Sequence, residues 1–459
     1  MTVKRLETDI CVVGAGPAGL AAATAAAAAG ARTLVVDAFP SPGGQYWMQP
    51  PVTADATAQA LEGQDAIAAA RAAAVQFLPG TEIFAAYPGF KLYGTGTEGA
   101  VKIVCRRLIA ASGAHDRSVA FPGWTLPGVM TPGGAQRLAK LQGVLPGKRI
   151  VLAGSGPFLW SVADSLLRKG ATIVALVEAQ QPSLALGMHL LGYPERWLET
   201  WRLVRHVRAH VGSVIFGQIV VAAEGQDRVA AVTLRDRRTG TLQKIEAIDS
   251  LLVGYGFQPS IELTSVLGCR HRYDDALGGW HAEADPRTGL TSVSGVYAAG
   301  EVLGVAGARP ASCSGRLAGL ASAAALGFAT DPLERTVAWR GLKRARRFGH
   351  GLGRLFAPPP ELAGLATEST LVCRCEDVRA GEVFAACAAG AASNYNAKLW
   401  TRAGMGRCQG RVCRMTLTAL IGKATGRAAV DIGFNRPRFP IRPAPVQTVL
   451  EAMTEADMT

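Results

Sequence analysis

The chain has 459 residues, 49% of them hydrophobic and 18% charged, so it can form two or three domains with large cores and has no long disordered tail. The formal net charge of +13 indicates either a solvated basic surface or a basic interface for an acidic partner or a membrane surface. Basic residues are not interleaved with aromatic ones and no helix-turn-helix pattern occurs, which excludes a nucleic-acid-binding class.

The N-terminus leads directly into a predicted strand. The first ten residues leave no room for a secretory signal, and the apolar run 19–31 is too short to span a bilayer and reads as a buried helix. The nine cysteines are an odd number and do not form a disulfide framework of the secreted type. Five stand singly among apolar residues: Cys11, Cys105, Cys269, Cys313 and Cys387. We therefore expect a cytoplasmic protein.

Residues 8–37 have the layout of a dinucleotide-binding β-α-β unit. An apolar strand, ICVVG, is followed by G-x-G-x-x-G at the opening of a helix. The first glycine permits a tight turn, the second lets backbone amides approach a pyrophosphate, and the third lets helix and strand pack closely. A second strand, TLVVD, ends in an acidic residue placed to accept hydrogen bonds from ribose hydroxyls. The predicted binding residues are Gly14, Gly16, Pro17, Ala18, Gly19 and Asp37.

Three later segments favour FAD as the nucleotide of this unit. PSPGGQYW and LIAASGA resemble the loop that passes the flavin and the strand-turn segment that closes the first nucleotide half in glutathione-reductase-like flavoproteins. SGVYAAGEV resembles their late strand and turn, whose acidic residue meets the ribityl chain; here it is Glu where the family usually has Asp. A helix from about Ser312 would direct its N-terminal dipole toward the flavin. These segments add Gly44, Gln45, Ala111, Ser112, Gly113, Gly300 and Glu301 to the predicted FAD-binding residues.

Residues 149–178 repeat the layout of the first unit, with Gly154, Gly156 and an acidic Glu178 at the end of the second strand. The unit resembles the inserted NAD(P)H domain of the same flavoprotein superfamily. Its third small position holds Leu159, and a bulky residue there pushes the helix away from the strand or fills the ligand's space. A functional NAD(P)H site therefore remains one interpretation of this unit. The sequence favours the other, which is a retained scaffold or a site for a different nucleotide.

The order of these units predicts an α/β fold with two dinucleotide-binding domains, like that of glutathione reductase, followed by a small C-terminal helical domain. LLVGYGFQPS resembles the return from the insertion, which lacks the C-x-x-C dithiol of relatives such as thioredoxin reductase. The flavin therefore needs an electron acceptor other than a dithiol. The expected boundaries are 1–120 and 250–335 for the FAD domain, 121–249 for the insertion, 336–367 for a linker, 368–430 for the cysteine-bearing domain, and 431–459 for a tail.

Four grouped cysteines mark the C-terminal domain. They form a C-x-C pair and a C-x4-C pair with thirty-two residues between them: Cys373, Cys375, Cys408 and Cys413. Structural zinc usually takes pairs with two intervening residues, so the spacing favours a 2Fe-2S cluster over zinc or no metal. Gly404, Gly406 and Gly410 leave backbone amides free to hydrogen-bond cluster sulfurs. The arrangement resembles the bacterioferritin-associated-ferredoxin-like (BFD-like) 2Fe-2S domain.

As a whole, the chain resembles the A or α subunits of heteromeric flavin dehydrogenases: the A subunits of octopine and nopaline oxidases, the corresponding subunit of hydrogen cyanide synthase, and the α subunits of D-hydroxyproline and L-proline dehydrogenases. The cysteine quartet, GVYAAGE and the segment 121–138 carry this resemblance. It implies that a smaller partner subunit with its own FAD removes a hydride from a carbon–nitrogen bond. Electrons would then pass to this chain's cluster and FAD, and on to a quinone or dye. Some relatives hold FMN at the subunit interface, a site that this sequence does not locate.

Two other functions remain open. A self-sufficient NAD(P)H-dependent FAD/iron–sulfur reductase is opposed by Leu159, and a non-redox scaffold is opposed by the cysteine quartet. No general base is predicted, because the seven histidines show neither metal spacing nor a catalytic-triad context: His115, His189, His206, His210, His271, His281 and His350. Trp197 and Trp201 are expected to pack in the core.

Overall fold

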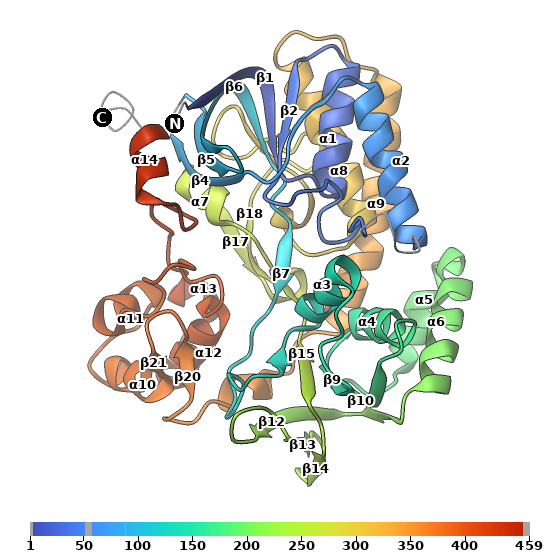
Figure 1. Cartoon of the computed structure of the whole chain (residues 1–459), viewed down its shortest axis with the longest axis vertical. Coiled ribbons are helices and arrows are strands. Elements are labelled where there is room, and N and C mark those ends of the chain that lie inside the picture. The colour runs from blue at the N-terminus through green and yellow to red at the C-terminus, as the bar shows by residue number, and fades with distance from the viewer. Residues whose placement is uncertain (1–2, 51–56, 88, 453–459) are drawn as a thin grey trace.

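Two mainly parallel β-sheets, one in each dinucleotide-binding unit, organise the chain (Figure 1). The computed structural model describes residues 3–50, 57–87 and 89–452. A smaller helical domain, near the C-terminus, lies to one side of both units in Figure 1. The predicted α/β fold class with two dinucleotide-binding domains is therefore confirmed.

The first sheet has the order β3-β2-β1-β6-β5-β4, with β19 paired to the C-terminal end of β6. Strands β3, β2, β1, β6 and β19 run parallel, whereas β4, β5 and β6 form an antiparallel meander. Strand β2 is buried along its whole length, as expected of a strand between two helical layers. The bounds are β1 Lys4–Val13, α1 Pro17–Ala28, β2 Thr33–Val36, α2 Ala58–Ala72, β3 Gln76–Leu78, β4 Glu82–Tyr87, β5 Lys91–Gly96, β6 Gly99–Ala110, β19 Val296–Ala298 and α8 Ala308–Ala324.

Small residues let α1 and α8 approach closely. A Cβ atom on Gly315 would overlap the carbonyl oxygen of Ala18, and one on Gly319 would overlap that of Ala22. The alanine-rich run predicted as a buried helix is α1, and its alanines fill the gap between the sheet and α8. Close packing here depends on the absence of larger side chains.

The second sheet has the order β11-β10-β9-β15-β8 and is parallel throughout. A three-stranded antiparallel sheet, β12-β13-β14, lies beside it, and the short pair β7 and β16 connects this unit to the first. The bounds are β7 Ala114–Asp116, β8 Val129–Met130, α3 Pro132–Gln142, β9 Arg149–Gly154, α4 Pro157–Leu167, β10 Thr172–Glu178, α5 Leu184–Leu191, η1 Pro194–Arg196, α6 Trp197–His210, β11 Ser213–Phe216, β12 Gln218–Glu224, β13 Ala231–Asp236, β14 Leu242–Glu246, β15 Ser250–Gly254 and β16 Phe257–Pro259.

The surface of α5 and α6 differs from the expectation for the two tryptophans. Trp197 is 46% exposed and Trp201 is 56% exposed, so their predicted place in the core is wrong. The apolar positions of α6 face outward over much of their length, and Val207 is the one buried residue that the structure describes in this helix. None of the helices in the part of the chain that the structure describes has the length and hydropathy to traverse a bilayer.

Much of the segment expected to be a linker is helical. Helix α9, Pro332–Leu355, begins with the Asp331 carboxylate accepting from the Leu333 N–H at 2.7 Å. Most of its arginines lie on the outer face. Its buried positions follow a helical period: Ala338, Leu342, Ala345 and Gly349. An extended segment with the short helix η4, Pro360–Gly364, then leads to the C-terminal domain.

The C-terminal part consists of short helices around one small hairpin. Its last segment returns to the first sheet, where the Ile441 N–H donates to the Phe84 carbonyl at 2.8 Å and the Phe439 ring stacks on Tyr87. Residues 431–452 are therefore packed. The remaining bounds are α7 Glu262–Val266, β17 His271–Asp274, η2 Asp275–Leu277, β18 Gly279–Ala282, η3 Gly300–Leu303, β20 Leu371–Cys373, β21 Val378–Arg379, α10 Ala380–Ala388, α11 Asn394–Thr401, α12 Arg414–Thr425, α13 Ala429–Ile432 and α14 Val446–Ala452.

A buried ion cluster holds the C-terminal part against the first domain. The Glu262 side chain at the start of α7 is 1% exposed and lies 2.8 Å from the Arg414 guanidinium, whose side chain is 2% exposed. Arg442 lies 3.3 Å and Arg411 3.8 Å from its other oxygen. Burial alone would raise the pKa of Glu262, but the surrounding cations, Arg414 foremost, lower it to about 2. Glu262 is thus the shared partner of all three arginines, and Arg442 also lies 3.2 Å from Glu82.

Among the described residues, substituting Glu262→Gln leaves Arg411 and Arg414 without an ion-pair partner and Arg442 with Glu82 alone. Loss of one partner of a buried pair costs about 3–5 kcal/mol. The folded-state pKa lies below the ordinary value of 4.5, so the stabilisation is present above about pH 4.5 and is lost as pH falls toward 2. Urea unfolding at pH 7 and pH 3 measures both effects. The control Glu283→Gln removes a more exposed partner of Arg270 and should cost at most about 1 kcal/mol. Equal unfolding midpoints for Glu262→Gln and the parent would contradict this account.

Candidate cofactor and metal sites

The glycine turn after β1 has the shape that a dinucleotide requires. Gly14 has φ +110°, and a Cβ atom there would overlap the carbonyl oxygen of Ala111. A Cβ atom on Gly19 would overlap the carbonyl of Gly14, which is the close strand–helix packing predicted for the third glycine. Gly44, with φ +61°, approaches so closely that its Cβ would lie 2.8 Å from the Cα of Gly16. The loop expected to pass the flavin therefore lies directly against the turn.

Asp37 fixes this turn from the end of β2. Its carboxylate accepts from the backbone N–H of Ala15 and, at 2.7 Å, from that of Phe39. Burial raises the pKa of Asp37, and the two backbone hydrogen bonds oppose that rise. The carboxylate thus sits at the carboxyl end of the parallel strands, where this class of sheet binds its ligands.

The other segments predicted for FAD reach the same edge of the sheet. Ala111 follows β6 and donates its N–H to the Val13 carbonyl at 2.9 Å, and Gly300 follows β19. Glu301 accepts a hydrogen bond, at 3.1 Å, from the N–H of Gly307, the N-cap residue of α8. Helix α8 begins at Ala308, earlier than predicted. Burial raises the pKa of Glu301. Ala111, Gly300 and Glu301 therefore lie at the same edge of the sheet as Asp37, and Gln45 is exposed.

The second glycine turn, between β9 and α4, is built in the same way. Gly154 and Gly156 have φ of +154° and +106°, and Glu178 accepts from the N–H of Gly156 at 2.9 Å and from that of Gln180 at 3.0 Å. Leu159 is 1% exposed and packs inward on α4. The bulky residue is therefore accommodated in the core of this unit, and the turn keeps its form.

The chain's own linker lies across this second turn. The Ser155 hydroxyl donates to the Phe356 carbonyl at 3.0 Å, and the Phe356 side chain is so close that a Cβ on Gly156 would lie 3.6 Å from it. The Gln180 amide donates to the Ala357 carbonyl at 2.8 Å. The residues around the turn therefore bond to the linker where the class would place a pyrophosphate.

An ion pair secures the same segment. Arg237, just after β13, is bonded to Glu361 at 3.1 Å and also donates to the Ala179 carbonyl and the Gln180 side chain. An arginine beside the acidic residue of a dinucleotide turn is the group that accommodates a 2′-phosphate. Sequence reasoning missed both Arg237 and the linker, since neither lies near the glycine motif in the chain.

The four grouped cysteines come together from two loops. Cys373 ends β20 and is within hydrogen-bonding reach of Cys413, the N-cap residue of α12, while Cys375 is paired with Cys408 in the same way. The bond from Cys413 lowers the pKa of Cys373 to about 6 and raises that of Cys413. Cys373 and Cys413 are buried, and the other two are half-buried.

Backbone donors surround these sulfurs. The Gly404 N–H donates to the Cys373 sulfur at 3.5 Å, and the Cys408 N–H donates to that of Cys375. Gly404 and Gly410 have positive φ and nearly touch, and a Cβ on Gly406 would overlap Cys375. Glycine at these positions therefore lets the second loop close over the first.

The donor chemistry fits an iron–sulfur cluster, although the sulfurs do not stand in ligand geometry. Within residues 3–50, 57–87 and 89–452, no group of three or more His, Cys, Asp or Glu side chains is arranged to hold a metal ion. Four cysteine thiols are the donor set of a 2Fe-2S cluster, and N–H donors to sulfur tune its potential.

A polar chain connects the first site with the cysteine loop. The Ser112 hydroxyl donates to the Ser260 carbonyl at 2.6 Å, and the Ser260 hydroxyl bonds to His115 at 3.1 Å. The other ring nitrogen of His115 lies 3.3 Å from the Arg411 carbonyl, which also accepts from Gln258. Burial lowers the pKa of His115 to about 4, so it is neutral at pH 7. This histidine joins two domains and is not a surface residue.

Known proteins resemble the chain over nearly its whole length. A family model described as pyridine nucleotide-disulphide oxidoreductase matches residues 8–325, and one described as sarcosine oxidase A3 domain matches residues 367–453. The A subunit of opine oxidase from Agrobacterium tumefaciens is 32% identical over 95% of this chain and 90% of its own length. The protein of that name from Rhizobium meliloti (strain 1021) is 34% identical over 95% and 96%. The HcnB subunit of hydrogen cyanide synthase from Pseudomonas protegens is 32% identical over 76% of both chains.

Solved structures show the same fold at lower identity. L-proline dehydrogenase from P. horikoshii superposes with a TM-score of 0.75 over 98% of this chain and 80% of its own, at 18% identity. Thioredoxin reductase from T. acidophilum gives a TM-score of 0.53 over 70% and 99%, at 20% identity. Because it covers 98% of this chain, the first structure also extends over the C-terminal part.

The fold and the first glycine site define a flavoprotein of the pyridine nucleotide-disulphide oxidoreductase class, for which FAD is the implied cofactor. Within that class, the chain belongs to the family of the opine oxidase A subunit, HcnB and the sarcosine oxidase α subunit, so the predicted resemblance to the A or α subunits of heteromeric flavin enzymes is confirmed. It is an oxidoreductase subunit of multi-subunit enzymes.

Because the linker covers the second turn, NADH and NADPH should not reduce the bound flavin rapidly. The double variant Phe356→Gly/Glu361→Gln removes the side chain that packs on Gly156 and releases Arg237 from its ion pair, while the backbone carbonyl of residue 356 stays. NADPH should then bind more tightly by up to about fivefold, since a partly exposed ion pair contributes roughly 0.2–1 kcal/mol. Stopped-flow bleaching and NADPH titration measure the two effects.

The matched control is Glu334→Gln on α9. Glu334 is the ion-pair partner of Arg316, and its side chain is as exposed as that of Glu361. It should leave NADPH binding unchanged. Rapid bleaching of the parent flavin by either nucleotide would show that the linker does not block the site.

Proposed function

We propose that this chain is the FAD- and 2Fe-2S-containing electron-transfer subunit of a heteromeric dehydrogenase linked to a dye or quinone. The enzyme would oxidise a carbon–nitrogen bond of an opine, amino or imino acid. A smaller FAD-containing subunit would carry out that oxidation. The whole-length similarity to the A subunit of opine oxidase supports the enzyme class.

The observation that carries the proposal is the meeting of the cysteine loops next to the flavin-type domain. Cys413 precedes Arg414, whose buried bond to Glu262 fixes the cysteine loop on α7. On the opposite side, His115 and Gln258 hold the Arg411 carbonyl. The loop is therefore anchored from both flanks to the domain that bears the first dinucleotide site.

The chain's own residues would define how the two groups are held. The glycine turn, Asp37 and Glu301 would seat FAD, and the four cysteines would ligate the cluster. Bound together, FAD can accept electrons in pairs and a 2Fe-2S cluster carries one at a time. Gly404 and Cys408 would donate backbone hydrogen bonds to cluster sulfur ligands, and such bonds tune the potential.

The alternative of a self-sufficient NAD(P)H-dependent reductase is disfavoured by the covered second turn. A reductase of that type needs the nicotinamide nucleotide at the turn where Phe356 and Ala357 lie. Electrons would instead enter from a partner subunit, in keeping with the subunit names of the relatives.

A surface for such a partner is offered by the outer side of α5 and α6. None of the described residues of α5 is buried, and the two helices expose large apolar side chains: Leu184, Met188, Leu191, Trp197, Leu198 and Trp201. Large exposed apolar side chains gathered on neighbouring elements are typical of interaction sites on soluble proteins. We assign it to the partner flavoprotein subunit.

Replacing one ligand of the quartet should abolish the cluster. Cys408→Ser is expected to lower iron content and visible absorbance in anaerobically purified protein at least about tenfold, because second-shell changes alone already cost 10–100-fold. The flavin should remain, since Cys408 lies outside the first site. Iron analysis and reduced-state EPR measure the effect.

Cys387→Ser is the matched control, since Cys387 is a half-buried thiol on α10 of the same domain and outside the quartet. It should keep full iron content. A colourless parent protein that binds zinc, or a Cys408→Ser variant with unchanged iron, would contradict the proposal.

The partner surface has its own test. Met188→Asp/Leu191→Asp places two charges in the α5 surface and should prevent co-purification with the proposed partner flavoprotein subunit. Leu242→Asp, an equally exposed leucine on β14, should not. Retention of the complex by the double variant, or loss only of self-association, would assign this surface to something else.

A further inference from the structure

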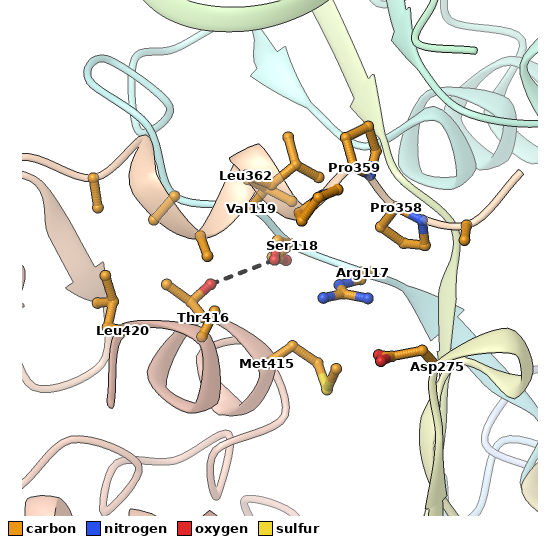
Figure 2. Close-up of a pocket in the computed structure, with 16 residues that line it drawn as sticks. Arg117, Ser118, Val119, Asp275, Pro358, Pro359, Leu362, Met415, Thr416 and Leu420 are labelled. Carbon is orange, nitrogen blue, oxygen red and sulfur yellow. Dashed lines mark hydrogen bonds between the residues drawn. The ribbon is translucent and has the colours of Figure 1, made fainter. Parts of the chain in front are cut away.

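A cavity lies where three segments meet that are far apart in sequence. Its walls come from residues 117–120 after β7, from the linker residues 357–366 and from α12, with Asp275 of η2 at the rim, and its volume is about 250 Å³ (Figure 2). The linker therefore contacts the second glycine turn and also forms part of the wall of this cavity. Neither predicted cofactor site includes it.

Arg117 supplies an unmatched cation to the cavity. Its side chain points into the space between Pro358 and Met415 in Figure 2. Among the residues that the structure describes, its guanidinium has no hydrogen-bond or ion-pair partner. Burial lowers the pKa of Arg117, but a guanidinium remains charged in proteins. A desolvated fork of N–H donors is suited to a carboxylate, which it binds with two parallel bonds.

Asp275 supplies a second charge at the rim. One of its oxygens accepts from the Tyr273 hydroxyl at 2.6 Å, and in Figure 2 the carboxylate faces the side on which Arg117 lies. Its charge acts on Arg117, yet the two groups form no ion pair within 4.0 Å among the described residues. A gap between opposite charges leaves room for a ligand that carries both.

The rest of the wall is mostly apolar, and the Thr416 hydroxyl in it donates to the Ser118 carbonyl at 3.5 Å. Its larger side chains are Pro358, Pro359, Leu362, Met415 and Leu420. The volume lies below the roughly 300–1,000 Å³ of pockets for drug-sized ligands. A molecule that fits must therefore be small, with a compact aliphatic part.

We propose that this cavity binds a small zwitterion of the amino-acid or imino-acid type. The carboxylate would seat on Arg117, the ammonium would face Asp275, and the aliphatic part would lie against the prolines and Leu420. The second charge at the rim disfavours a phosphate dianion, because Asp275 would repel it and Arg117 is the only cation among the described residues of the wall. The site joins the linker to α12, so an occupant would strengthen the contact between them.

The test is a calorimetric titration of the full isolated chain with three probes of equal ring size. L-Proline carries both charges, pyrrolidine lacks the carboxylate, and cyclopentanecarboxylate lacks the amine. L-Proline should bind at least about tenfold more tightly than either of the others, as expected when each charge has its own partner. This readout involves neither metal nor turnover, so its failure is distinct from failure of the proposed electron transfer.

Two variants assign the charges. Arg117→Gln should weaken L-proline binding at least about tenfold, and Asp275→Asn should remove the preference for L-proline over cyclopentanecarboxylate. Arg335→Gln, on the exposed side of α9, is the control and should bind as the parent does. Leu420→Trp, which fills the cavity, replaces Arg117→Gln if that variant does not fold.

Three outcomes would overturn the proposal. The first is no saturable binding of L-proline to the parent. The second is equal binding of L-proline and cyclopentanecarboxylate, which would indicate a simple anion site. The third is unchanged L-proline affinity in both Arg117→Gln and Leu420→Trp.

Discussion

The buried carboxylate of Glu262 is the constraint on which the arrangement of this molecule depends. It is the acidic partner of Arg411, Arg414 and Arg442, which come from the cysteine loop, the helix after it and the returning C-terminal segment. A charge removed from water is tolerated only with close partners, so this group can be buried only when the segments are assembled. The position of the cysteine loop is thereby coupled to the fold of the flavin-type domain.

The two glycine turns share one local structure but differ in what contacts them. Both place a carboxylate on backbone amides of the turn, Asp37 in the first and Glu178 in the second. At the second turn, carbonyls of the linker accept from Ser155 and Gln180. A hydrogen-bonding site without a ligand must be satisfied by water or protein, and here the protein supplies the groups.

The linker also connects the second glycine turn, the cavity beside Arg117 and the cysteine-bearing domain. One side of it covers the second turn, the other forms part of the wall beside Arg117, and its end leads into the cysteine-bearing domain. Helix α9 before it is held in place by a regular apolar stripe. A movement of the linker would therefore change both the turn and the cavity, because Ala357 accepts from Gln180 at the turn and also lines the cavity.

The sequence by itself determined the two dinucleotide units, their glycine turns and the grouping of the four cysteines, because strand, turn and helix signals act over short stretches of chain. The ends of α8 and the helical nature of residues 336–355 were less accurately predicted, and Trp197 and Trp201 were placed wrongly, since an amphipathic pattern does not say whether its apolar side meets a core or solvent. Only the tertiary structure decided that the linker covers the second turn, that Glu262 meets its arginines and that Arg117 is left unmatched among the described residues. These depend on contacts between residues more than a hundred positions apart, which local patterns do not encode.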